Sequence, residues 1–122
     1  MPGKALEDWL EEAGGSHAVR SAVLALARAA VSVSGEIHSA AQGVAPTDRR
    51  GAQPDVGEEQ KTLERFGNDC FLEEVRAAPV ALFASGETEH PELLDPSATL
   101  AVAVDSLDGS VNIDINMPIG TV

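Results

Sequence analysis

Two acidic side chains follow an apolar run near the C-terminal end of the sequence, where residues 102–112 read VAVDSLDGSVN. Asp105 and Asp108 could hold a Mg²⁺ ion, which takes oxygen ligands from one or two carboxylates together with waters and a phosphate. The carbonyl oxygen of Leu107 lies between them and could face the same ion. Backbone N–H groups of Gly109 and Ser110 could hold a phosphate, because such groups attract anions at turns and helix starts. The segment therefore predicts a site where a cation and a phosphate meet.

The same residues also suit an ordinary turn after a strand. An Asp-Gly pair is a common turn former, and the side chains of Ser110 and Asn112 could cap it. Two aspartates three residues apart are a weak signal by themselves. The residues alone leave both interpretations open.

The elements around this segment must place it at the end of a buried strand. Hydrophobic periodicity predicts helices first and strands later, which favours an α+β fold with long N-terminal helices packed on the start of a mainly antiparallel sheet. Ser16 is the expected N-cap of the second helix. The expected helices span residues 5–13, 16–42 and 58–76, and the expected strands span residues 80–84 and 99–106.

The second helix carries a continuous apolar stripe. Its members recur at three- and four-residue spacing and are Val19, Val23, Leu26, Ala30, Val33 and Ile37. Leu24, Ala27 and Val31 widen the stripe, so we expect this helix to be largely buried.

Composition limits the classes of partner and compartment. The formal net charge of −12 argues against a nucleic-acid partner, which needs a basic surface. Cys70 is the only cysteine, so no internal disulfide can form, as expected in a reducing compartment. We find no apolar run long enough to span a membrane and no secretion signal, and we expect a cytoplasmic protein without a membrane partner.

Three blocks of the sequence resemble class I fructose-1,6-bisphosphatases. GEEQKTLERFGND (57–69) resembles the family's GEEQKKLDVLSND helix, and VALFASGETE (80–89) resembles a strand that ends in Ser-Glu-Glu. VDSLDGSVNID (104–114) resembles the metal-binding signature DPLDGSSNID. The resemblance covers about residues 18–122, and it implies a layered sugar-phosphatase fold in which residues 1–122 form the N-terminal domain.

The resemblance implies Mg²⁺-dependent hydrolysis of the 1-phosphate of fructose 1,6-bisphosphate, in an enzyme that forms homo-oligomers and serves carbohydrate metabolism, including gluconeogenesis. It assigns the metal to Asp105, Asp108 and the Leu107 carbonyl, and the phosphate to Gly109 and Ser110. Asp69 and Glu87 match acids that help to activate the attacking water. Residues 43–57 fall where the family has a mobile catalytic loop.

Two departures from the family pattern matter for the site. Gly86 stands where the first glutamate of Ser-Glu-Glu is a metal ligand, so Glu87 could serve either as a metal ligand or as the water-activating acid. Ser106 replaces a proline that would pre-set the turn.

The length of the chain opens further alternatives. The family continues past Val122 into a second domain with further substrate contacts, so we expect this chain to be weakly active or inactive alone. The first alternative is a non-catalytic acidic module that binds Mg²⁺ or a partner subunit. The second is an inositol-phosphate-type phosphatase, whose family shares DPLDGT.

Overall fold

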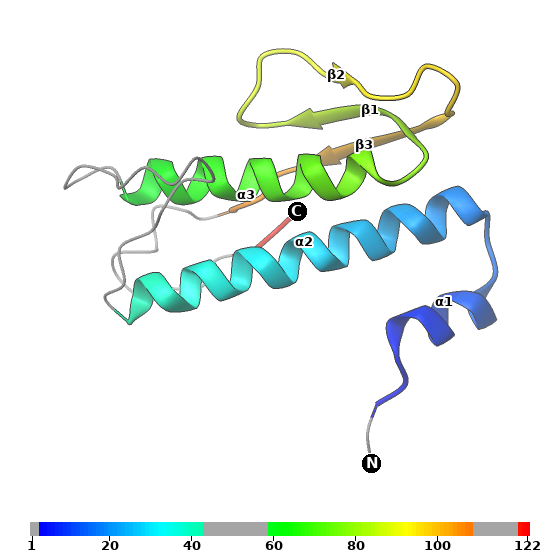
Figure 1. Ribbon diagram of the computed structural model, residues 1–122, viewed down its shortest axis with the longest axis horizontal. Helices are drawn as coiled ribbons and strands as arrows, with labels where there is room; N and C mark the ends of the chain where they lie inside the picture. Colours follow the sequence, from blue (N-terminus) through cyan, green and yellow to red (C-terminus); the bar gives the residue numbers. More distant parts are fainter. Residues whose placement is uncertain (1–2, 43–58, 109–119) are drawn as a thin grey trace.

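A computed structural model describes residues 3–42, 59–108 and 120–122. The helices and strands lie in the predicted order, with all helices before the strands (Figure 1). Helix α3 lies between helix α2 and the sheet, and it packs against both (Figure 1). The elements are α1 (Leu6–Ala13), α2 (His17–Ala41), α3 (Glu59–Arg76), β1 (Val80–Ser85), β2 (Glu92–Leu93) and β3 (Leu100–Val104). The predicted α+β class with stacked helices is confirmed.

The junction between α1 and α2 follows directly from three residues. Gly14 and Gly15 have φ angles of 77° and 99°, in the region that favours glycine, so the pair reverses the chain after α1. Ser16 then caps α2, because its Oγ accepts a hydrogen bond of 3.2 Å from the backbone N–H of Val19. The predicted N-cap is confirmed.

Helix α2 buries one face rather than most of its surface. Its buried face is built mainly from small side chains, Ala22, Ala25, Ala29 and Val33. Val31 on the outer face is 74% exposed, so the expectation of a largely buried helix is wrong. Alanine at the contact surface lets two helices approach closely, which suits a sequence with only three Phe and one Trp.

Helix α2 is also long and apolar enough to cross a membrane, judged by length and composition over His17–Ala40. The expectation that no apolar run reaches that length is therefore wrong. One such helix is weak evidence for a membrane span, because the core helix of a globular protein meets the same criteria. Here the face that carries Ala25 and Ala29 is fully buried within the fold.

The described sheet has three strands in the order β2-β1-β3. β1 pairs antiparallel with β2, and it pairs in parallel with β3, with Ser85 opposite Val104. The predicted antiparallel character therefore holds for one of the two pairings. The short strand β2 lies in the stretch that the sequence analysis treated as a connection, and two residues are too few for strand periodicity to reveal.

The core lies where α2 and α3 meet the inner face of the sheet. Its largest fully buried side chains are Phe71, Phe83, Leu63, Val75 and Val80. Leu63, Cys70 and Val75 form the inner face of α3, and Phe66 packs against the same core. This core fixes the orientation of α3 relative to the ends of β1 and β3.

Candidate active site

The parallel pairing of β1 and β3 creates the site. Because parallel strands end at the same edge of a sheet, the turn after Ser85 lies beside the turn after Val104. The first turn carries Glu87 and the second begins with Asp105. Two acids from separate sequence blocks are thus brought to one edge of the sheet, as the resemblance requires.

The electrostatics of Glu87 confirm that acids gather here. Partial burial raises the pKa of the Glu87 carboxyl, and the negative charges of Glu64 and Asp105 raise it further. Glu64 comes from α3, so three different elements contribute to this negative field. A cation placed among these carboxylates would relieve their repulsion.

A polar cavity of about 390 Å³ lies beside Glu87. Helix α3 contributes its other walls, Lys61, Glu64, Arg65 and Asn68. These four residues recur at three- and four-residue spacing, so they lie on one face of the helix. The cavity therefore combines two cationic and two anionic side chains, which suits a charged, phosphate-bearing ligand better than an apolar one.

Two hydrogen bonds tie the Glu87 turn to α3. Ser85 Oγ donates to Asn68 Oδ1 at 2.5 Å, and the same hydroxyl oxygen accepts the backbone N–H of Glu87 at 3.1 Å. Asn68 is only 9% exposed, so this pairing satisfies a buried amide oxygen. The sequence analysis assigned no role to Asn68 or Ser85. The only sequence feature that could have indicated a role was their position in the blocks 57–69 and 80–89 that resemble the family.

The turn formed by residues 105–108, here called the Asp105–Asp108 turn, is held by the return of the chain at residues 120–122. Asp105 N–H donates to Val122 O at 2.6 Å, and Val122 N–H donates to Asp105 O at 2.9 Å. Asp108 and Gly120 exchange a second pair of bonds of 2.7 and 3.0 Å. All four bonds use main-chain atoms, so the two aspartate side chains remain exposed and available as ligands.

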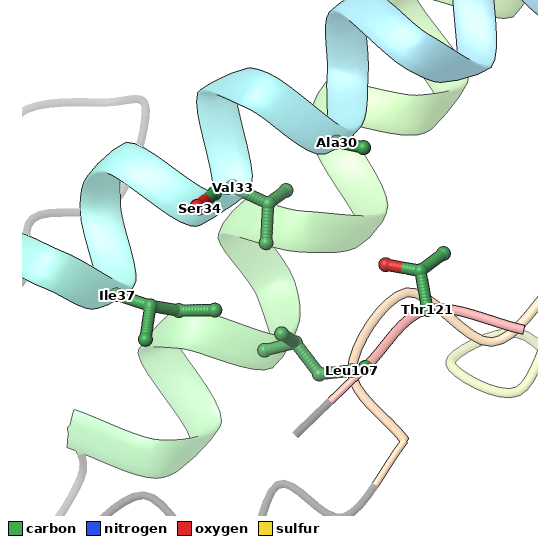
Figure 2. Close-up of a pocket in the computed structure, with 7 residues that line it drawn as sticks. Ala30, Val33, Ser34, Ile37, Leu107 and Thr121 are labelled. Atoms are coloured by element: carbon green, nitrogen blue, oxygen red, sulfur yellow. The ribbon is translucent and has the colours of Figure 1, made fainter. Parts of the chain in front are cut away.

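Leu107 anchors this turn through its side chain. It is 6% exposed and points toward Val33 and Ile37 of α2 (Figure 2). A small cavity of about 210 Å³ remains between the turn and α2. The predicted role of Leu107 concerned its carbonyl oxygen, and its buried side chain explains why an apolar residue stands between two exposed acids.

The remaining predicted residues lie as follows. Asp69 is half-buried on α3, next to Asn68, and it is not among the residues that line the polar cavity. Gly109, Ser110 and residues 43–57 lie outside the described residues. Within the described ranges, no three His, Cys, Asp or Glu side chains lie close enough together to hold a metal ion.

The comparison with protein families decides the relationship. A model described as "Fructose-1-6-bisphosphatase, N-terminal domain" matches residues 5–122. The chain belongs to the fructose-1,6-bisphosphatase family. The resemblance predicted from the three sequence blocks is confirmed.

Individual fructose-1,6-bisphosphatases agree with this assignment. The chain is 45% identical over 107 residues to fructose-1,6-bisphosphatase class 1 of Rhizobium meliloti (strain 1021), which covers 88% of this chain and 31% of that protein. It is 40% identical over 120 residues to a class 1 enzyme of Xanthobacter autotrophicus (strain ATCC BAA-1158 / Py2), covering 97% of this chain and 32% of the relative. The chain thus spans about a third of the length of the curated relatives it matches.

The fold also agrees with a solved fructose-1,6-bisphosphatase. The holo form of the Leishmania major enzyme superposes with a TM-score of 0.76 over 99% of this chain and 38% of the other. The two share 18% sequence identity, so this likeness supports the fold alone.

Proposed function

We propose that this chain provides the metal-binding part of a Mg²⁺-dependent phosphatase that hydrolyses the 1-phosphate of fructose 1,6-bisphosphate. The observation that carries the proposal is the convergence of Glu87, Glu64 and Asp105 at the edge where β1 and β3 end. Family membership supports the reaction type, because the relatives are named for this activity.

The available donors suit magnesium. Carboxylate and carbonyl oxygens are the hard ligands that Mg²⁺ prefers, and one or two carboxylates are sufficient when waters and a phosphate complete the octahedron. Asp105, Asp108 and the Leu107 carbonyl would hold the ion, and Glu87 would stay free to act on the attacking water. When bound, the ion would polarise the phosphoryl group and lower the pKa of the attacking water.

The side chains of this chain would manage the proton and the substrate. Glu87, whose raised pKa brings it closer to that of a useful general base, would accept a proton from the attacking water, with Asp69 assisting. The water oxygen forms the new bond to phosphorus while the bond from phosphorus to the sugar oxygen breaks. The sugar oxygen takes a proton from solvent, and the products are fructose 6-phosphate and inorganic phosphate. N–H groups of Gly109 and Ser110 would bind the phosphate oxygens.

The same proposal covers the domain organisation, the location and the partners of the protein. Residues 1–122 would form the N-terminal domain of a cytoplasmic enzyme that acts on a small sugar phosphate and assembles with copies of itself. We expect neither a nucleic-acid nor a membrane partner, since the net charge of −12 opposes anionic surfaces of both kinds.

A specific observation favours one alternative. Gly86 provides no carboxylate at the family's ligand position, and the described residues contain no group of three potential metal ligands. The missing carboxylate at position 86 favours a non-catalytic acidic module that binds Mg²⁺ or a partner subunit. The two functions differ in turnover rather than in metal affinity.

The test measures phosphate release from fructose 1,6-bisphosphate with Mg²⁺, and Mg²⁺ binding by calorimetry, for the chain and for its Asp108→Asn variant. Asp8→Asn is the matched control, because Asp8 is an exposed aspartate on α1. Release that disappears only in Asp108→Asn supports the phosphatase. Metal binding that depends on Asp108 without any release supports the module. Faster release from inositol 1-phosphate than from the sugar bisphosphate would favour the inositol-phosphate alternative.

A further inference from the structure

Gly67 lies inside α3, where the helix packs against the Asp105–Asp108 turn. A Cβ atom at this position would lie 3.0 Å from Ser106 Oγ, 3.2 Å from Ser106 Cβ and 3.6 Å from Leu107 Cγ. The first two distances are shorter than ordinary van der Waals contacts. At every other glycine that the structure describes, no neighbouring atom lies within 4 Å of such a Cβ.

Backbone conformation does not explain this glycine. Among the described glycines only Gly14 and Gly15 have positive φ, so Gly67 has a conformation that any residue can adopt. Glycine is less favourable than alanine inside a helix because it loses more conformational freedom on folding. The contact with Ser106 is therefore the physical reason for glycine at position 67.

Burial and hydrogen bonds restrain the turn from moving away from a larger residue. Ser106 is 4% exposed and Leu107 is 6% exposed, so both are enclosed between α3 and the rest of the core. On the other side, the turn is fixed by its main-chain bonds to residues 120–122, and Thr121 Oγ1 donates to Ser106 O at 3.0 Å. A side chain at position 67 would push the turn against these bonds.

We infer that Gly67 is a positioning residue for the Asp105–Asp108 turn. Its missing side chain lets Ser106 and Leu107 pack on α3, and their burial directs the flanking side chains of Asp105 and Asp108 outward to the same edge as Glu87. The role of these two carboxylates as metal ligands rests on the proposed function. The packing of Ser106 and Leu107 on α3 does not depend on that proposal.

The test compares Gly67→Ala with Gly35→Ala, a matched helical substitution on α2 with open space around it. Amide hydrogen exchange is followed at Asp105, Asp108, Gly120 and Val122, whose N–H groups hold the turn. The Leu94 amide, which bonds Ala81 O at 2.8 Å in the distant strand pair, is the reference. We expect Gly67→Ala to accelerate exchange at the turn about tenfold more than at Leu94. Gly35→Ala should leave that ratio unchanged.

A second substitution shows whether the contact with Ser106 is the cause. Ser106→Ala removes the oxygen nearest to the new methyl group, so the Gly67→Ala/Ser106→Ala double variant should recover part of the lost protection. If Gly67→Ala does not fold, recovery of folding in the double variant supports the inference. Equal acceleration at Leu94 and the turn, or a double variant no better than Gly67→Ala, would overturn it.

Magnesium titration of the same variants separates this inference from the proposed function. Weaker Mg²⁺ binding in Gly67→Ala than in Gly35→Ala would extend the positioning role to the ligands. Absence of Mg²⁺ binding in the unsubstituted chain would contradict the proposed function, while the exchange measurement would still decide the role of Gly67.

Discussion

Magnesium should offset part of the stability cost of a Gly86→Glu substitution. Gly86 is exposed, and no atom lies within 4 Å of a Cβ built there, so the backbone and surroundings accept a side chain. Gly86 and Asp105 also line the same shallow cavity of about 330 Å³. A glutamate at position 86 would therefore add a carboxylate beside Asp105 and Glu87.

Without metal, the added charge should destabilise the chain relative to Gly86→Gln, which matches it in shape and backbone entropy. An exposed charge pair contributes about 0.2–1 kcal/mol, so repulsion from two acids amounts to about 0.5–2 kcal/mol. For a domain of this size, that free energy lowers the melting temperature by about 2–8 °C.

With magnesium, this cost should shrink. A carboxylate about 4 Å from a divalent ion gains about 2 kcal/mol in the dielectric of water. Ordering the glutamate side chain costs about 1–1.5 kcal/mol of this gain. The remainder predicts binding tighter than in Gly86→Gln by about two- to fivefold. The assay is calorimetric Mg²⁺ titration together with melting curves at several metal concentrations. Equal affinities of the two variants, or a difference in melting temperature between Gly86→Glu and Gly86→Gln that is the same at saturating Mg²⁺ as without metal, would refute the reasoning.

Three further predictions concern the supports of the site. Ser85→Ala removes the hydroxyl between Asn68 and the Glu87 turn and should cost about 1–3 kcal/mol in urea denaturation, because a buried amide oxygen loses its partner; an unchanged midpoint would contradict this role. Phe83→Ala should cost about 3–5 kcal/mol because Phe83 is fully buried, whereas Leu82→Ala on the same strand should cost much less, since Leu82 is 40% exposed. Glu87 holds its proton in the folded state over a pH interval in which the unfolded chain has lost it, so its contribution favours folding below that interval and is lost as the pH rises through the raised pKa. Melting curves of Glu87→Gln should lack this component, and identical pH profiles for the two proteins would exclude it.

The helices were predictable because their signals are local. The apolar stripe of α2 and its N-cap Ser16 depend on neighbouring residues only, and both were found. Exposure was less predictable, because Val31 continues the apolar pattern of α2 and yet faces outward. The buried side of α2 is set by the packing of α3 against it, and the spacing of residues along α2 does not contain that information.

The sequence predicted which acids belong to the site, but not how close together they lie in the fold. Asp105 and Glu87 were identified from motif resemblance, while their proximity depends on the parallel register of β1 and β3. The same register made the prediction of a mainly antiparallel sheet incomplete. Gly67 and Asn68 were passed over because their roles depend on contacts with residues far away in the sequence, at Ser106 and Ser85.

The shape of this turn depends on main-chain bonds between residues 105–108 and 120–122, whereas its chemistry depends on its side chains. Since no side-chain oxygen of either aspartate takes part in those bonds, either acid can change its identity while the loop keeps its shape. Such a loop tolerates evolutionary drift in its ligands, and the same freedom makes it a scaffold for engineering. Cysteine or histidine at positions 105 and 108 would offer softer donors on an unchanged backbone, and would shift the metal preference from magnesium toward zinc.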